Sequence, residues 1–284
     1  MTRKPTVAIV GAGSLASSLA PALAAAGYTI TEIIARGRKQ SLQRARALAT
    51  KVGARAATVE TAALNADLLW FCVPDREIRA AAASIASRAA SAIRFAFHSS
   101  GALLSRELEA LRKQDVKVAS VHPLMTFVPR SRPSLTNVPF ALEGDPAAAK
   151  LAHRIARDVG GESFSLLGRK KTAYHAWATM TSPLLLAYLV ALEEVAAAAG
   201  LSRKDARRMS LPIIVQTLAN YGSLGSKHSF SGPFIRGDAE TVAQHLAVLK
   251  KLAGARQVYV ALARTALRGL PVKNRKELSR LLPD

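Results

Sequence analysis

Cysteine, aromatic residues and acidic residues are all scarce in this 284-residue chain. The single cysteine, Cys72, excludes an intramolecular disulfide bond, and its place in an apolar run predicts a small buried side chain. Aromatic residues make up only 5% of the sequence and do not alternate with the basic segments, so the stacking surface typical of single-strand binders is not indicated. No group of histidine, cysteine and carboxylate residues has metal-ligand spacing, and we expect no metal site.

The shortage of acidic residues leaves a large positive charge. The sequence contains 40 lysine and arginine residues against 19 aspartate and glutamate residues, a formal net charge of +21. Such a charge by itself gives non-specific contact with nucleic acid, but no zinc-finger or RNA-binding motif accompanies it. We interpret the excess as a solvated basic surface plus a site for a polyanionic cofactor. A nucleic-acid binder is the less favoured alternative, which salt-dependent DNA binding without cofactor would support.

Long uninterrupted hydrophobic runs are also lacking. The most apolar stretch, residues 176–192, contains Pro183 and is shorter than the roughly 20 residues of a membrane span. We therefore expect a core or dimer-interface helix there and no membrane contact. Near the N-terminus, Arg3 and Lys4 precede only a short apolar run, which is not the pattern of a secretory signal, so a cytoplasmic protein is expected.

What the sequence does contain is a glycine-rich turn, GAGSLA, directly after a predicted strand at residues 6–10. An alanine-rich helix follows it, as the dinucleotide-binding pattern G-x-G-x-x-A requires. Gly11 permits the tight turn, Gly13 lets backbone approach a pyrophosphate, and Ala16 lets the helix pack on the strand. The free N–H groups of the helix N-terminus favour phosphate binding. The predicted cofactor contacts in this turn are Gly11, Ala12, Gly13, Ser14, Leu15 and Ala16.

The end of the second predicted strand, residues 28–35, discriminates between NAD and NADP. In NAD-binding sheets an acidic residue at this strand end holds the ribose 2′-hydroxyl. Glu32 has a suitable distance from the glycines, but the strand pattern continues beyond it to Arg36. Because a guanidinium matches phosphate geometry, the sequence predicts NADP. The expected 2′-phosphate contacts are Arg36, Arg38, Lys39 and Ser41.

Strand and helix patterns alternate through the first part of the chain and give way to helical periodicity in the second part. We expect residues 1–165 to form an α/β, Rossmann-type doubly wound, mainly parallel sheet, and residues 166–284 to form an all-α domain for substrate binding and dimerisation. Ligands of such sheets lie beyond the carboxyl ends of the strands. The first turn to consider there adds Val73, Pro74, Asp75 and Ile78 to the predicted cofactor contacts.

Two further strand ends carry polar residues that can perform chemistry. The segment FHSSGA places His98, Ser99 and Ser100 after one strand, and SVHP places His122 after the next. Histidine can transfer a proton near neutral pH, and hydroxyls can orient a polar substrate. The alternative is that these side chains only cap strand ends through hydrogen bonds.

The start of the helical part supplies the remaining candidates. Lys171 and His175 are four residues apart and share a helix face, where the lysine can bind an anionic substrate or polarise a carbonyl. The alternative is a plain basic helix start. Ser182 lies two turns further along this face, and Arg236 lies beside a Gly-Pro turn; both are candidates for substrate binding.

Six segments in this order resemble one bacterial family, which has a Rossmann-like N-terminal domain followed by a C-terminal domain of unknown function, number 2520. The resemblance implies a place in the superfamily of pyrroline-5-carboxylate reductase, deazaflavin-dependent NADP oxidoreductase, prephenate dehydrogenase and 6-phosphogluconate dehydrogenase. Members bind NAD(P) and usually dimerise through the helical domain. The segments are AIVGAGSLASSLAPAL, FCVPDREI, FHSSGALLS, SVHPLMTF, KKTAYHAWATMTS and FSGPFIRGDAETVAQHL.

Part of the superfamily's chemistry can be transferred through this resemblance. Prephenate dehydrogenases have a serine and an H-P turn at similar strand ends, and their histidine hydrogen-bonds the substrate hydroxyl that loses its proton. The resemblance thus implies His122 as the proton-handling residue. Hydroxyacid dehydrogenases have a K-x-x-x-N pair at the start of the helical domain; Lys171 has the place of the lysine, and His175 stands where asparagine would be.

Together these patterns predict a dimeric NADP-dependent oxidoreductase that transfers a hydride between NADP(H) and a small polar substrate, an anionic one included. The alternative is a non-catalytic NADP-binding sensor or partner-binding protein, which the departures from the superfamily's catalytic residues favour. Turnover of NADPH with a panel of carbonyl compounds and imines would separate the two.

Overall fold

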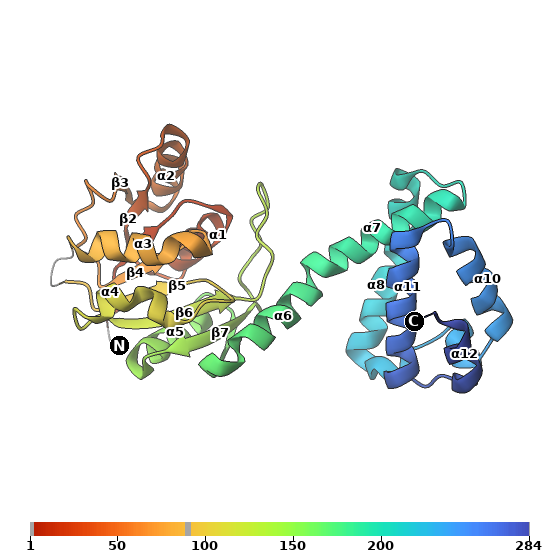
Figure 1. The fold of residues 1–284 in the computed structure, drawn as a ribbon. Coiled ribbons are helices and arrows are strands. Elements are labelled where there is room, and N and C mark those ends of the chain that lie inside the picture. Colours follow the sequence, from red (N-terminus) through yellow and green to blue (C-terminus); the bar gives the residue numbers. More distant parts are fainter. Residues whose placement is uncertain (1–2, 89–91, 284) are drawn as a thin grey trace. The chain divides into compact units, whose positions relative to one another are not determined.

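The computed structural model describes residues 3–88 and 92–283. It divides into two compact units, Met1–Thr179 and Met180–Asp284 (Figure 1). The first unit ends later than the expected boundary at residue 165. The reason is long-range contact: helix α6 (Lys171–Thr181) begins with Lys171 and Tyr174 buried, and both bond to residues of β6 in the first unit.

The first unit is built on one eight-stranded sheet in the order β3-β2-β1-β4-β5-β6-β7-β8. All neighbouring strands are parallel except β6 and β7, which are antiparallel. This confirms the mainly parallel, doubly wound sheet predicted from the sequence. The strands are β1 (Val7–Val10), β2 (Ile30–Ala35), β3 (Arg55–Thr58), β4 (Leu68–Phe71), β5 (Phe95–His98), β6 (Lys117–Pro123), β7 (Pro139–Gly144) and β8 (Glu162–Ser165).

Helices bury both faces of this sheet, which explains why its central strands read as continuous apolar runs. Side chains of β1 alternate between the faces: Val7 and Ile9 join one core cluster, Ala8 and Val10 the other. The first cluster includes residues of α1 (Ser14–Ala25), α2 (Lys39–Val52) and α5 (Pro146–Asp158); the second includes α3 (Asp75–Ala86) and Leu111 of α4 (Glu109–Arg112). Two short 3₁₀ helices, η1 (Ser105–Leu108) and η2 (Gly168–Lys170), complete the unit.

The second unit is helical throughout, as predicted. Its helices are α7 (Pro183–Ala198), α8 (Arg203–His228), α9 (Pro233–Arg236), α10 (Ala239–Leu249), α11 (Ala253–Gly269) and α12 (Arg275–Leu281). Its core contains Val242, Val260, Ala263 and Leu278. Asp238 caps α10 by accepting a hydrogen bond of 3.0 Å from the Thr241 N–H.

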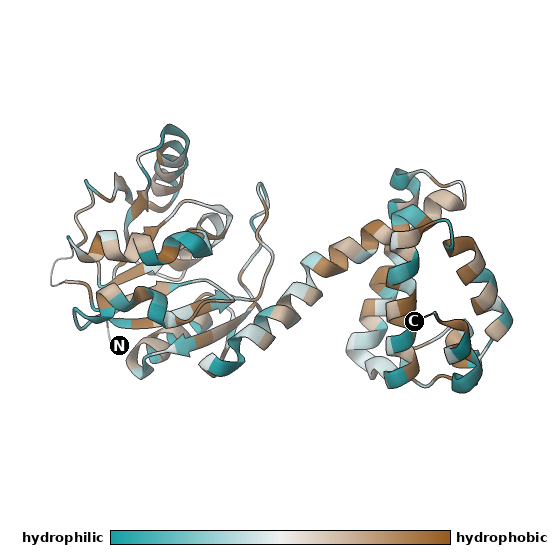
Figure 2. Ribbon diagram, in the orientation of Figure 1, coloured by the Kyte–Doolittle hydropathy of each residue, from teal (hydrophilic) through white to brown (hydrophobic). Residues whose placement is uncertain are grey.

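Large apolar side chains remain exposed on α7 and α8. Leu186 is 64% exposed, Ile213 69% and Val215 61%, and Figure 2 shows hydrophobic residues along α7. By length and composition alone, the helical stretch Gly168–Ala198 could also cross a membrane. Its first turn, however, buries Lys171 and Tyr174 in the first unit, so at least this part lies within the folded protein.

Candidate functional site

The turn between β1 and α1 has the conformation that its glycines predict. Gly11 has φ of +109°, and a Cβ atom there would lie 2.5 Å from the carbonyl oxygen of Cys72, so only glycine fits. A Cβ atom on Gly13 would meet no protein atom closer than 3.9 Å. The protein itself therefore does not require glycine at position 13, and the open space favours close approach of a ligand. Ala16 is fully buried against the strand layer, and Leu15 packs on the same cluster.

A cleft of about 550 Å³ begins at this turn and extends beyond the carboxyl ends of β1, β2 and β4. It brings together seven of the fourteen predicted cofactor contacts; Ser14, Leu15 and Ala16 are among those that do not line it. Arg38 and Lys39 are exposed and do not line it, whereas Arg44 and Arg76 do although the sequence did not single them out. Its polar and turn residues are Gly11, Ala12, Gly13, Arg36, Ser41, Arg44, Val73, Pro74, Arg76 and Glu77.

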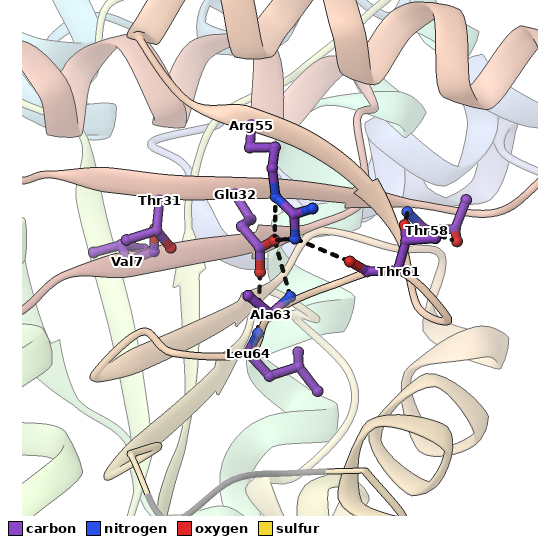
Figure 3. Close-up of polar contacts among 8 residues, drawn as sticks. All are labelled: Val7, Thr31, Glu32, Arg55, Thr58, Thr61, Ala63 and Leu64. Carbon is purple, nitrogen blue, oxygen red and sulfur yellow. Dashed lines mark hydrogen bonds and ion pairs between the residues drawn. The ribbon is translucent and has the colours of Figure 1, made fainter.

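Glu32, the competing candidate for a ribose contact, is used within the protein (Figure 3). Its carboxylate is 2% exposed and accepts hydrogen bonds from Arg55 Nε at 3.0 Å and from the backbone N–H groups of Ala63 and Leu64 at 3.1 and 3.2 Å. Because these partners hold both oxygens, Glu32 presents no acceptor to the cleft. The β2 strand ends at Ala35, so Arg36 is the first residue beyond it.

Three predicted cofactor contacts need comment. Arg36 forms an ion pair of 2.8 Å with Glu77 across the cleft and is half-exposed. Asp75 accepts a hydrogen bond of 2.7 Å from the Ser100 hydroxyl, and Ile78 is fully buried in the core beneath α3. Neither Asp75 nor Ile78 lines the cleft: Asp75 is exposed but bonds to Ser100, and the side chain of Ile78 points into the protein.

The turn after β5 is internally bonded. His98 is fully buried; its Nε2 lies 2.9 Å from the Leu104 carbonyl, and its Nδ1 accepts from the Ser100 N–H at 3.2 Å. Burial lowers the pKa of His98 to about 4. Ser99 accepts from Trp70 Nε1 at 2.8 Å, and Ser100 Oγ accepts from two backbone N–H groups as well as donating to Asp75. These contacts favour the alternative reading, in which His98, Ser99 and Ser100 hold the turn in shape.

His122, at the end of β6, has a different environment. Its Nδ1 lies 2.7 Å from the Tyr174 hydroxyl, and the two rings meet edge-on. Burial lowers the pKa of His122 to about 4, with further lowering by Lys171 and His175, and burial raises the pKa of Tyr174 to about 12. At neutral pH the phenol and the imidazole are both uncharged, so the direction of this hydrogen bond follows the imidazole tautomer: with the phenol as donor, the imidazole carries its proton on Nε2.

The other ring nitrogen of His122, Nε2, lies beside Gly101 and His175. A Cβ atom built on Gly101 would lie 2.8 Å from His122 Nε2 and 2.9 Å from His175 Cδ2. No residue in the described part of the chain hydrogen-bonds this Nε2. The glycine thus lets the His122 ring pack against its backbone, with the exposed His175 beside it.

Lys171 lies close to this histidine but is only 3% exposed. Its ammonium donates to Ser120 Oγ, which in turn donates to the Ser100 carbonyl at 3.0 Å. Burial lowers the pKa of Lys171 to about 8, although the charges of Glu143 and Asp75 oppose this effect. The structure therefore places a buried lysine close to a neutral histidine, a pair that can stabilise developing negative charge when the imidazole presents an N–H.

Sequence reasoning missed Ser120 and did not assign a role to Tyr174. Ser120 lies two residues before His122 on the same strand face, and Tyr174 lies three residues after Lys171 on the same helix side, so periodicity could have identified both. Ser182 and Arg236 belong to the second unit. Ser182 precedes α7 and is exposed, and Arg236 is the exposed last residue of α9.

Comparisons with known proteins agree with this architecture. Residues 6–94 match the model of coenzyme F420-dependent NADP oxidoreductases, and residues 138–266 match the domain of unknown function DUF2520. Among curated proteins, none matches the chain.

Solved structures share the fold over nearly the whole chain. A Bacteroides fragilis protein named as an NADP oxidoreductase is 22% identical, with a TM-score of 0.75 over 92% of this chain and 97% of its own. Pyrroline-5-carboxylate reductase from Coxiella burnetii is 15% identical, with a TM-score of 0.60 over 99% and 100%. An imine reductase variant from Myxococcus stipitatus, in complex with NAD+, is 18% identical, with a TM-score of 0.58 over 99% and 100%.

These likenesses show the fold, and the two family models account for successive parts of the sequence. The resemblance seen in the motifs is confirmed: a segment that matches the NADP oxidoreductase model precedes a segment that matches DUF2520.

Proposed function

We propose that the protein is an NADP(H)-dependent reductase that acts on the C=O or C=N group of a small polar substrate. The observation that carries the proposal is the joint presence of a glycine turn with its open cleft and, three strands further along the same sheet edge, the pair of His122 and Lys171. The match to NADP oxidoreductases supports it, as does the shared fold with reductases of a pyrroline carboxylate and of imines.

The cleft fits a dinucleotide on its own geometry. Gly13 leaves room for a phosphate at the N-terminus of α1, where no side chain caps the first turn. Arg36, Ser41 and Arg44 line the part of the cleft where a ribose 2′-phosphate would be held. The Arg36 guanidinium donates a hydrogen bond to Glu77 through Nη1, and its other N–H groups can donate to a phosphate.

A bound dinucleotide supplies the hydride, and the chain's own residues manage the charge that hydride transfer creates. Negative charge develops on the substrate oxygen or nitrogen. His122 donates a hydrogen bond to this atom through Nε2–H, and Tyr174 fixes the tautomer that makes this possible. Lys171, which is charged below about pH 8, stabilises the same charge from its buried position, and the reduced oxygen or nitrogen then takes a proton from water.

This assignment changes the role first expected for His122. A histidine with a pKa of about 4 carries no acidic proton at neutral pH, so it acts as a neutral hydrogen-bond donor rather than as the acid. Oxidation of NADPH, followed with a panel of small carbonyl compounds and cyclic imines, tests the proposal. If NADPH binds and no panel member is reduced, the protein is a dinucleotide-binding sensor instead.

The cofactor preference gives a sharper test at Arg36. Wild-type protein is expected to bind NADPH at least about tenfold more tightly than NADH, because a charge-assisted guanidinium–phosphate contact contributes about 1.5–3 kcal/mol. Calorimetry on Arg36→Ala should show that most of this preference is lost. Arg38→Ala is the matched control, since Arg38 is exposed and outside the cleft. Equal affinity of wild-type protein for NADPH and NADH would refute the NADP assignment.

We also propose that the second unit forms a homodimer through α7 and α8. The exposed leucine, isoleucine and valine side chains on these helices exceed what a monomer's surface usually carries. Light scattering at micromolar concentration should give about twice the 30.1 kDa chain mass. Ile213→Glu should shift the mass toward one chain, whereas Lys227→Glu at the end of α8 should not. A wild-type monomer would contradict this proposal.

A further inference from the structure

A second hollow, of about 340 Å³, lies on the other side of the glycine turn. Three elements form it: the N-terminal turn of α1, the exposed side of α2, and the loop that joins β6 to β7. The residues that line it are Ala12, Gly13, Ser14, Ser17, Arg44, Ala47, Leu48, Lys51, Pro129, Arg130, Ser131 and Arg132.

The charged residues that line this hollow are all basic. Arg44, Lys51, Arg130 and Arg132 line it, and no acidic residue does. Within residues 3–88 and 92–283, none of these four side chains has an ion pair or hydrogen bond, whereas Arg36 in the neighbouring cleft is paired with Glu77. Four unneutralised cations around one small space repel one another, so an anion is the ligand that this space suits.

The loop that carries two of these cations is bent toward the turn. In Figure 1 the segment between β6 and β7, residues 124–138, extends well beyond the sheet. Arg130 adopts a left-handed backbone with φ of +71°, and the Ser131 N–H closes a turn on the Val128 carbonyl at 3.1 Å. Such a backbone costs energy for arginine, and here it places Arg130 and Arg132 opposite Ser14 and Ser17 of α1.

The two hollows share Ala12, Gly13 and Arg44. One ligand can therefore extend from the larger cleft across Gly13 into the smaller hollow. If the larger cleft holds the adenosine half of a dinucleotide, the diphosphate lies at Gly13, at the border of the hollow that the four cations line.

We propose that Arg130 and Arg132 bind the diphosphate of the dinucleotide, and that the loop 128–132 closes the phosphate site over the N-terminus of α1. This inference rests on the proposed function, because it takes the dinucleotide as the ligand. It assigns a role to a loop that neither the glycine motif nor the 2′-phosphate residues include. The diphosphate is common to NADP and NAD, so this site does not discriminate between them.

The experiment compares two pairs of substitutions by titration with NADPH and with NADH. Arg130→Gln combined with Arg132→Gln should weaken both dinucleotides by the same factor, at least about tenfold, and should reduce the salt dependence of binding. Arg36→Ala should weaken NADPH only. Arg106→Gln with Lys113→Gln, two exposed residues outside both hollows, removes the same charge and should leave both affinities unchanged.

The outcomes separate this inference from the proposed function. Loss of NADPH affinity alone would assign the loop arginines to the 2′-phosphate and overturn the proposal, as would unchanged affinity for both. If the wild-type protein binds neither dinucleotide, the proposed function fails. Titration with inorganic pyrophosphate then decides: binding that the double variant loses supports an anion site in this hollow, and absence of binding refutes it.

Discussion

A Lys171→Met variant is expected to reduce substrate about 10²–10³-fold more slowly than wild-type protein while binding NADPH with unchanged affinity. The ammonium is buried beside His122 and bonded to Ser120, and it does not line the cofactor cleft. Methionine has a similar length and no charge, so the variant keeps the packing and loses the electrostatic effect. Steady-state measurement of NADPH oxidation by Lys171→Met should therefore show a selective loss of kcat.

The pH dependence of kcat provides an independent reading of the same residue. Because the pKa of Lys171 is lowered to about 8, the side chain is charged below this pH and neutral above it. The wild-type kcat for reduction should therefore fall as the pH rises through about 8, and the Lys171→Met profile should be flat there. Lys170→Met, a change at the exposed neighbouring residue, should keep the wild-type rate and profile. A wild-type rate in folded Lys171→Met would refute the role.

The sequence predicts the fold well because its signals are local and consistent. Strand β1 with its glycine turn, the apolar run of β4 and the long amphipathic α2 each combine one periodicity with clear end signals. The position of Arg36 just beyond β2 also follows from strand length alone, which is why Glu32 could be set aside before the structure showed its partners Arg55, Ala63 and Leu64.

The parts that sequence reasoning did not resolve depend on contacts between distant residues. Helix α5 and strand β8 lie within the expected Rossmann part, residues 1–165, but no sequence pattern was assigned to them. The bond between Lys171 and Ser120 joins residues 51 positions apart and moves the start of α6 into the first unit. No local pattern contains that pairing.

The two candidate catalytic histidines, His98 and His122, have different environments, again because of contacts between distant residues. His98 and His122 follow neighbouring strands and look equivalent in the sequence. The turn after β5 folds back so that Leu104 and Ser100 occupy both nitrogens of His98, whereas Gly101 leaves one nitrogen of His122 free. A glycine three residues after a histidine says nothing by itself about another strand, and only the three-dimensional packing distinguishes the two side chains.

The second large effect is expected at His122, where substitution by asparagine and substitution by glutamine should change kcat to different extents. His122→Asn keeps a polar group near the position of Nδ1 and removes the donor at Nε2. His122→Gln places an amide N–H near the position of Nε2. If the neutral imidazole donates to the substrate, His122→Asn should lower kcat by about 10²–10³-fold, the usual cost of removing one donor to a developing charge. His122→Gln should retain a substantial part of the rate.

Tyr174→Phe completes this test because it removes the hydroxyl that fixes the tautomer. Without that donor the proton of His122 can move to Nδ1, so kcat should fall while the affinity for NADPH stays at the wild-type value. The wild-type kcat should also show no titration between pH 5 and 7.5, because the pKa of His122 is about 4. Equal loss of rate in the asparagine and glutamine variants, together with an inflection near pH 6.5, would show instead that His122 transfers a proton. A titrating donor loses its function in both amides, whereas a neutral donor loses it in only one.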